Sequence, residues 1–533
     1  MSTVSKIEQE VARRRTFAII SHPDAGKTTI TEKILLFGGA IQMAGTVKSR
    51  KSKKFATSDW MEIEKQRGIS VTSSVMKFIY KNFEINLLDT PGHQDFSEDT
   101  YRVMTAVDSA LMLIDGAKGV EAQTIKLLEV CRMRKSPVIT FMNKFDRFCR
   151  NPFDLLDEVE SVLKINCSPM TWPIGMGSDF KGVYDITTQS VRIFNPGEGQ
   201  SDFETVRIEG YMDPKLDELV GAEFADQLRE DMELLEGAGT PFSKEDYLNG
   251  SLTPVFFGSA INNFGVREFL ESFLEIAPKP KPREAVERLI QPTENKLTGF
   301  IFKIQANMDA GHRDRIAFMR ICSGKFTRGM KIYHSRLKRQ IKLNNTVTFM
   351  AKDREVMEEG YAGDILGLHD PGLYKIGDSF SMGEELSFTG IPHFSPENFM
   401  KVVLANPLKG KQLEKGLQQL TEEGATQVFR TTGSNQLILG VVGVLQFEVI
   451  KFRLQNEYGV EGLFEGVPYT CARWYHSDDP KTLQQFEQRY VSQVALDVDQ
   501  KKIFLCNSTW DLDFAKKKFE KIEFYQNSDH IPV

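Results

Sequence analysis

A lysine and a threonine stand together at the start of a predicted helix, where they can bind a phosphate group and its metal ion. Residues 16–20 are apolar and β-prone, and the residues after Thr29 place apolar side chains on one helical face. Gly26 lets the intervening loop point backbone N–H groups at phosphate oxygens beside a helix N-terminus. Lys27 can then reach the β- and γ-phosphates, and the Thr28 hydroxyl can bind Mg²⁺. The candidate phosphate-binding residues are Ser21, His22, Pro23, Asp24, Ala25, Gly26, Lys27, Thr28 and Thr29.

A second motif follows the apolar strand predicted at 83–88, and its residues are Asp89, Thr90, Pro91 and Gly92. An aspartate at the carboxyl end of a parallel strand can hold the Mg²⁺ shell through a water molecule. Gly92 can bring its N–H close to a γ-phosphate, so its loop would respond to that phosphate. Alone, this motif is an ordinary turn, and the phosphate loop departs from the usual pattern because Ser21 replaces its first glycine. Further motifs are therefore needed to identify a nucleotide-binding site.

Base recognition is predicted at the ends of two further buried strands. Asn143, Lys144 and Asp146 follow the strand at 137–142, and the Asp146 carboxylate can accept hydrogen bonds from N1–H and the amine of guanine. Adenine lacks that donor pair, so a buried carboxylate would be left unpaired. The segment Gly258, Ser259 and Ala260 closes the pocket after a second strand, which brings the backbone N–H groups of Ser259 and Ala260 toward the base oxygen. Four motifs in this order predict a GTPase that binds GTP, GDP and Mg²⁺ and disfavour a generic ATPase.

Two residues near the expected γ-phosphate are candidates for hydrolysis and switching. His93 follows Gly92 directly and can orient the attacking water, because phosphoryl transfer depends on positioning the nucleophile. Ser70 can offer a hydroxyl to Mg²⁺ only when the γ-phosphate is bound, which would order the polar loop 47–70. The basic run in that loop is explained equally well by solvation and by contact with RNA phosphates.

The length and composition of the chain indicate which broad class of protein it belongs to. With 533 residues, the chain is long enough for two to four domains, and 41% apolar with 26% charged residues is typical of globular proteins. The six cysteines have no metal-binding spacing, and neither a secretory signal nor an apolar membrane span is present in the sequence. We therefore expect a cytoplasmic protein without a membrane segment. A net charge of −6 argues only weakly against contact with nucleic acid.

Together these motifs resemble those of the translational GTPases in the elongation factor G branch. The resemblance rests on the segments 21–29, 64–70, 89–96 and 143–146, and the segments 21–28 and 58–74 are similar to the bacterial peptide chain release factor three family. Because the sequence ends at Val533, we expect it to lack the further C-terminal domains that elongation factor G carries. The resemblance implies a monomeric GTPase that works with the ribosome and removes class I peptide chain release factors after peptide release. Ribosome recycling, rescue of stalled ribosomes and a nucleotide-sensing binding module remain alternatives.

The expected fold is an α/β P-loop GTPase domain with an inserted subdomain, followed by a β-barrel domain and a two-layer α/β domain. We place the GTPase domain at 1–280 with an insert at about 147–253, because a proline-rich spacer occupies 277–283. Short alternating strands with glycines indicate a barrel at 281–388. A strand, helix, strand, strand, helix pattern over 399–458 indicates a split β-α-β layout in the domain at 389–533. Five basic residues there face either RNA or solvent: Lys401, Lys409, Lys411, Lys451 and Arg453.

Overall fold

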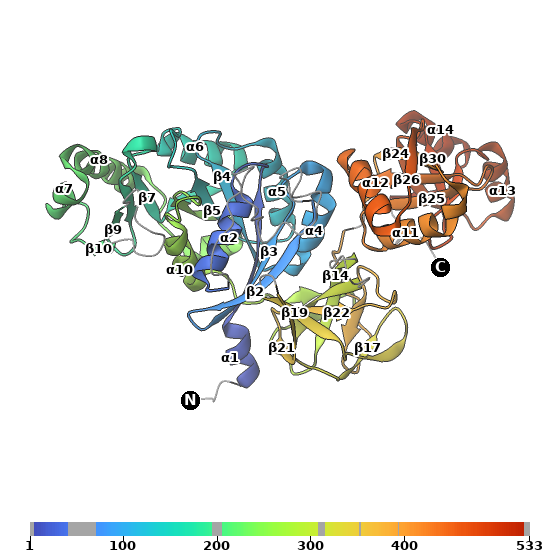
Figure 1. Cartoon of the computed structure of the whole chain (residues 1–533), viewed down its shortest axis with the longest axis horizontal. Coiled ribbons are helices and arrows are strands. Elements are labelled where there is room, and N and C mark those ends of the chain that lie inside the picture. Colours follow the sequence, from blue (N-terminus) through green and yellow to red (C-terminus); the bar gives the residue numbers. More distant parts are fainter. Residues whose placement is uncertain are drawn as a thin grey trace.

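The chain forms three successive units, each built on its own β-sheet, in a computed structural model (Figure 1). The structure describes residues 5–40, 71–193, 205–306, 315–350, 353–392 and 394–526. The predicted switch loop 47–70, with Ser70, lies outside these described residues. The observed order of an α/β unit, a β-rich unit and a C-terminal α/β unit confirms the predicted fold class.

The first unit contains a seven-stranded sheet in the order β2-β3-β1-β4-β5-β11-β6. Its strands pair in parallel except for β2, which pairs antiparallel with β3. The carboxyl ends of β1, β3, β4, β5 and β11 therefore meet at one edge, where the predicted motifs begin. The strands are β1 (Arg14–Ser21), β2 (Ser74–Tyr80), β3 (Phe83–Asp89), β4 (Ser109–Asp115), β5 (Val138–Asn143), β6 (Asn166–Pro169) and β11 (Leu252–Phe257).

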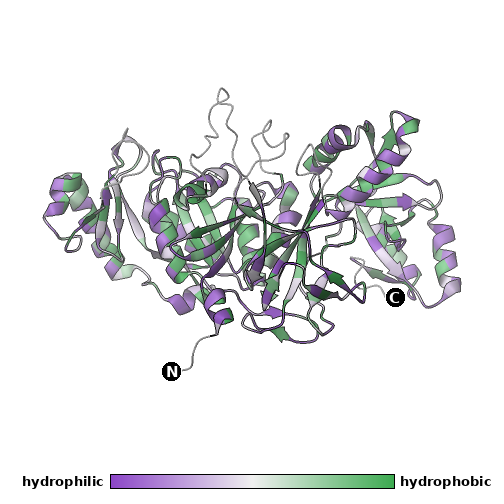
Figure 2. Cartoon of the chain, turned by 60° about the horizontal axis from the view of Figure 1, so that its bottom comes forward, coloured by the Kyte–Doolittle hydropathy of each residue, from purple (hydrophilic) through white to green (hydrophobic). Residues whose placement is uncertain are grey.

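Helices cover both faces of this sheet (Figure 1). Side chains alternate across a strand, so Ala18 and Ile20 of β1 pack into one buried cluster and Phe17 and Ile19 pack into another. Both faces are thus buried, as a parallel sheet requires, and hydrophobic residues fill its centre (Figure 2). The helices are α1 (Lys6–Ala12), α2 (Lys27–Phe37), η1 (Gln94–Phe96), α4 (Ser97–Ala106), α5 (Ala122–Met133), α6 (Pro152–Leu163) and α10 (Val266–Ile276).

The insert between β6 and β11 forms a four-stranded antiparallel sheet with adjacent helices, in the order β10-β9-β8-β7. The sequence pattern at 183–194 is typical of a hairpin, and in this segment β8 pairs antiparallel with β9. Trp172 joins the small sheet to its long helix, because its indole donates to Asp231 at 2.8 Å. The elements are β7 (Thr171–Ile174), η2 (Gly177–Asp179), β8 (Gly182–Asp185), β9 (Ser190–Ile193), β10 (Thr205–Arg207), α7 (Lys215–Val220), α8 (Ala222–Ala238) and α9 (Lys244–Asn249).

The second unit is an antiparallel β structure, with eight strands in the order β18-β17-β23-β14-β15-β22-β19-β20 and β16 paired to β21. The alternating sequence runs at 300–304, 315–321, 330–333, 346–349 and 364–368 predict strands, and each of them lies in or overlaps a strand of this unit. Short strands that the pattern does not predict complete the unit. The strands are β12 (Arg283–Glu284), β13 (Leu289–Ile290), β14 (Thr298–Ala306), β15 (Arg315–Ser323), β16 (Lys325–Thr327), β17 (Lys331–His334), β18 (Arg339–Lys342), β19 (Thr346–Met350), β20 (Asp353–Val356), β21 (Glu359–Tyr361), β22 (Ile365–His369) and β23 (Ser379–Ser381).

The C-terminal unit contains two copies of a β-α-β-β-α-β motif that share one eight-stranded sheet. The sheet order is β27-β24-β26-β25-β29-β30-β28-β31, and the halves join where β25 pairs antiparallel with β29. The sequence pattern predicted only the first half. That half comprises β24 (Asn398–Leu404), η3 (Pro407–Lys409), α11 (Gly410–Glu422), β25 (Gln427–Thr431), β26 (Leu437–Val441), α12 (Leu445–Tyr458) and β27 (Gly462–Gly466). The other comprises β28 (Cys471–His476), α13 (Pro480–Arg489), β29 (Val494–Leu496), β30 (Lys502–Cys506), α14 (Thr509–Lys518) and β31 (Glu523–Tyr525).

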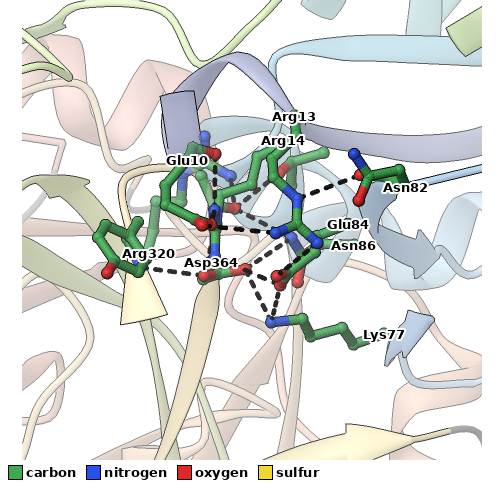
Figure 3. A network of polar contacts seen from close by, with 12 residues as sticks. Glu10, Arg13, Arg14, Lys77, Asn82, Glu84, Asn86, Arg320 and Asp364 are labelled. Carbon is green, nitrogen blue, oxygen red and sulfur yellow. Dashed lines mark hydrogen bonds and ion pairs between the residues drawn. The ribbon is translucent and has the colours of Figure 1, made fainter. Parts of the chain in front are cut away.

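A buried polar network joins the first two units around Asp364 (Figure 3). The Asp364 carboxylate accepts from Arg14 Nε at 2.7 Å and lies 3.1 Å from Lys77 Nζ. Glu84 pairs with the same two cations, at 3.3 Å and 2.6 Å. Burial would raise the pKa of Asp364, but Lys77 and Arg14 outweigh it and hold that pKa well below its usual range. The network therefore fixes the second unit against the first sheet through two carboxylates that share the same two cations.

Candidate functional site

The predicted phosphate loop connects β1 to α2 at the carboxyl edge of the sheet. Gly26 has a φ of 101°, in the left-handed region, and a side chain at this position would collide with Asn143. Glycine is thus required both for the backbone turn and for the close approach of the next motif. The Asn143 amide holds the loop from that side, since its Nδ2 donates to the Ala25 carbonyl at 2.8 Å.

Lys27 and Asp89, which come from two different motifs, form a buried ion pair. The distance from Lys27 Nζ to Asp89 Oδ1 is 2.5 Å. Thr90 anchors the same loop to the sheet, because its hydroxyl donates to the Ile19 carbonyl at 2.7 Å. Gly92 lies beside the phosphate loop, where a Cβ would be 3.6 Å from Pro23 Cα. The structure thus brings the phosphate loop and the Asp89 loop together, as the sequence predicted.

The side chains at this edge fit a divalent cation. Among the described residues, Asp89 Oδ2 and Ser21 Oγ are buried without a hydrogen-bond partner. A buried carboxylate oxygen without a donor is costly, so it is suited to a ligand that supplies positive charge or a bound water. Magnesium prefers oxygen ligands and retains several waters, which matches the Asp89 carboxylate beside a phosphate. Of the other two predicted ligands, Thr28 lies half-buried in the first turn of α2, and Ser70 lies outside the described residues.

The predicted base-recognition residues form a connected group at the ends of β5 and β11. Ser259 Oγ donates to Asp146 Oδ1 at 2.6 Å, and the Ala260 N–H donates to Asn143 Oδ1 at 2.9 Å. Gly258 lies against the Phe264 carbonyl, which leaves no room for a side chain. The Asp146 side chain is partly exposed. Its carboxylate is therefore held by Ser259 on one oxygen and retains acceptor capacity for a base.

Asp115 is a member of this site that the motif analysis missed. It ends β4, and its Oδ2 lies 2.6 Å from Lys144 Nζ, which also donates to the Asp24 carbonyl at 2.5 Å. Lys144 thus spans from the base loop to the phosphate loop, and Asp115 fixes its charged end. The available signal was an aspartate at the end of the wholly apolar strand 110–114, the same signal that identified Asp89.

His93 lies at the entrance of the Asp89 loop and begins the short helix η1. Its Nδ1 accepts the Asp95 N–H at 3.2 Å, and about a third of its side chain is exposed. The ring meets Phe96 edge-on, with centroids 6.2 Å apart. His93 therefore has one nitrogen engaged in the local turn, and its orientation depends on the segment 93–96.

Asp95 joins this segment to the C-terminal unit, a relationship that the sequence did not predict. Its Oδ2 accepts the N–H of Leu445, the first residue of α12, at 2.7 Å. A carboxylate at this position satisfies an unpaired N–H and lies at the positive end of the helix dipole. Next to it, Phe96 packs with Val71 and Val449 in a small apolar cluster. A side chain at Gly443 would collide with Asp95, so the two units meet at backbone distance.

A lysine of the second unit holds the chain where it leaves the predicted switch loop. Lys303 Nζ donates to the Ser73 carbonyl and hydroxyl at 2.5 Å and 2.6 Å, and lies 3.3 Å from Asp99. Burial would raise the pKa of Asp99, but Lys303 and the bonds from Ser73 lower it. All three units therefore contact the segments that flank the nucleotide edge of the sheet.

Family models match each of the three units. Residues 12–279 match the elongation factor Tu GTP binding domain, 296–383 match elongation factor G domain 2, and 388–516 match the C-terminal domain of class II release factor RF3. A solved structure from Thermus thermophilus has the same fold with a TM-score of 0.70 and 24% identity, over 88% of this chain and 71% of that one. Within the described residues, no helix has the length and apolar character needed to cross a membrane.

The fold and the matched GTP binding domain place this chain in the translational GTPase family, which hydrolyses GTP and works with the ribosome. Within that family, the chain is of the class II release factor RF3 type, a guanine-nucleotide-binding GTPase of translation termination.

Proposed function

We propose that this GTPase uses GTP to drive class I release factors off the ribosome after the finished peptide has been released. The observation that carries the proposal is the 2.7 Å hydrogen bond between Asp95, next to the nucleotide edge, and Leu445, in the unit that matches the release factor family. Through this bond, a loop that senses the γ-phosphate acts directly on the unit specific to release factors. A free-standing nucleotide switch would not need such a connection.

The nucleotide binds along the carboxyl edge of the first sheet. The phosphates lie over the loop 21–29, with Lys27 leaving Asp89 to pair with the β- and γ-phosphates. Guanine binds at Asp146, and Asn143 and Lys144 hold the base loop against the phosphate loop. Thr28, Ser70 and, through water, Asp89 would hold Mg²⁺, which would supply positive charge to neutralise the phosphates.

His93 positions the attacking water once the ribosome has changed its orientation. In the described structure, its Nδ1 is occupied by the Asp95 N–H, which leaves Nε2 as the nitrogen available to a water. Since the residues 93–96 are bonded to Leu445, any shift of the C-terminal unit on the ribosome moves His93 as well. Turnover is therefore slow in the free protein and fast on the ribosome.

The protein works as a cytoplasmic monomer with three domains, at 1–280, 281–388 and 389–533. These limits are supported by the sheets, each of which draws its strands from one range. Within the described residues, the connections at 277–297 and 382–397 contain no strands besides the short β12 and β13.

The test is the dissociation rate of a fluorescently labelled class I release factor from post-termination ribosomes, with this protein and GTP, GDP or no nucleotide. We expect acceleration with GTP only. Equal rates in all three conditions, with ribosome-stimulated GTP hydrolysis intact, would assign the protein another task in translation.

A further inference from the structure

One face of the C-terminal unit carries exposed aromatic rings beside cations. Trp510 and Phe514, one turn apart on α14, stack with centroids 5.3 Å apart and an interplanar angle of 19°. Their side chains are 71% and 37% exposed, although large apolar side chains are usually buried. The Arg489 guanidinium, from the end of α13, lies 5.7 Å from the Phe514 ring centroid. We name this surface the α14 face: Arg489, Trp510, Phe514, Lys516, Lys517 and Lys518.

The cations of the α14 face are available for an anionic partner. Arg489 and the three lysines in the last turn of α14 are exposed, and none forms an ion pair with another described residue. The basic edge predicted in the first half of the unit is different. There Arg453 is buried between Glu423 and Glu457, with N–O distances of 2.9 Å and 2.6 Å, and Lys401 pairs with Glu465. Arg453 therefore faces neither RNA nor solvent, the two alternatives that the sequence left open for it.

We propose that the α14 face binds unpaired RNA, with bases stacking on Trp510 and Phe514 and phosphates contacting the cations. Stacked aromatic rings accept any base because every base has a flat π face, and lysines beside them follow the backbone. A duplex would offer only its phosphates, since its bases are already stacked within it. An acidic peptide would use the cations but would leave the parallel rings without a matching partner. Single-stranded RNA can contact the rings with its bases and the cations with its phosphates. In the fold, α14 lies at the end of the C-terminal unit that is remote from the first sheet (Figure 1).

The test measures RNA binding by the full chain without ribosomes or nucleotide, so its outcome is independent of release factor dissociation. The probes are a short fluorescein-labelled oligoadenylate, the same sequence as a duplex, and a labelled polyglutamate peptide, each followed by anisotropy. The variants are Trp510→Ala with Phe514→Ala, and Lys516→Gln with Lys517→Gln and Lys518→Gln. The matched controls are Leu408→Ala, an 89% exposed apolar side chain of the same unit, and Lys331→Gln with Lys338→Gln and Lys342→Gln, three exposed lysines of the second unit.

We expect the aromatic double variant to weaken oligoadenylate binding at least tenfold, while the controls leave it unchanged. The triple lysine variant should reduce the slope of log affinity against log salt by about 2, as three lost phosphate contacts to a single strand imply. Unchanged oligoadenylate binding in the aromatic variant would overturn the proposal. The proposal would also be overturned if the wild-type chain bound the duplex as tightly as oligoadenylate or more tightly. The same result with the polyglutamate peptide would overturn it in favour of an acidic protein partner.

Discussion

Asp95 caps the helix α12 of the C-terminal unit, with its Oδ2 2.7 Å from the N–H of Leu445, although 350 residues separate the two in sequence. Asp95 also donates its own N–H to His93 Nδ1. A single residue thus contacts both the proposed hydrolytic histidine and the unit that matches release factors. A change in the nucleotide loop that moves Asp95 must either carry α12 with it or break the cap.

Replacing His93 should remove stimulated hydrolysis while preserving nucleotide binding. His93→Ala deletes the group proposed to position water, and general base or positioning groups typically contribute roughly 100-fold or more to turnover. We expect that loss in ribosome-stimulated phosphate release, with GTP affinity unchanged in an equilibrium binding assay. Full stimulated turnover in the variant would exclude this role for His93.

Replacing Asp146 should change the choice of base. In Asp146→Asn the carboxylate proposed to accept from guanine is lost, and leaving the donors of the bound base unpaired costs about 1–3 kcal/mol. Affinity for GTP should therefore fall roughly 10- to 100-fold relative to xanthosine triphosphate, which presents an oxygen where guanine has its amine. Competition binding with both nucleotides measures the ratio, and Ser259→Ala, which removes the donor to Asp146 at 2.6 Å, serves as a milder control. An unchanged preference for GTP would contradict the assignment of Asp146.

Replacing Asp364 should lower the free energy of unfolding and also reduce its dependence on pH. Asp364→Asn leaves Lys77 buried with Glu84 as its remaining counter-charge and Arg14 with Glu84 and Glu10, and breaking such a buried pair typically costs about 3–5 kcal/mol. The pKa of Asp364 is depressed in the folded state, so its contribution is present above its unfolded value of about 3.9 and is lost as the pH falls further. Urea unfolding of the wild type should therefore show falling stability below about pH 4, and the variant a smaller fall. Parallel pH profiles for both proteins would show that Asp364 is not the titrating group.

The sequence predicted those parts of the site that are short and contiguous. The loops at Lys27, Asp89, Asn143 and Ser259 each follow a buried strand, and the parallel order of those strands brings them to one edge. The same reasoning could have identified Asp115. The bonds from Asp95 to Leu445 and from Lys303 to Ser73 could not be predicted in this way, because they depend on how separate sheets pack.

The second half of the C-terminal unit was missed for a different reason. Its strands β29 (Val494–Leu496) and β31 (Glu523–Tyr525) have three residues each, too few to display an alternating pattern. They become strands because each lies beside a longer neighbour, β30 or β28, in the shared sheet. Tertiary pairing therefore decides their conformation.

The most direct test of the account compares Asp95→Ala with the wild type in the dissociation of a labelled class I release factor from post-termination ribosomes with GTP. Asp95→Asn is the matched control, because its amide oxygen can still accept from Leu445. We predict that Asp95→Ala binds GTP normally but loses most of the GTP-dependent acceleration, and that Asp95→Asn retains much of it. Wild-type acceleration in Asp95→Ala would show that the nucleotide state reaches the release factor by a route other than the Asp95–Leu445 bond.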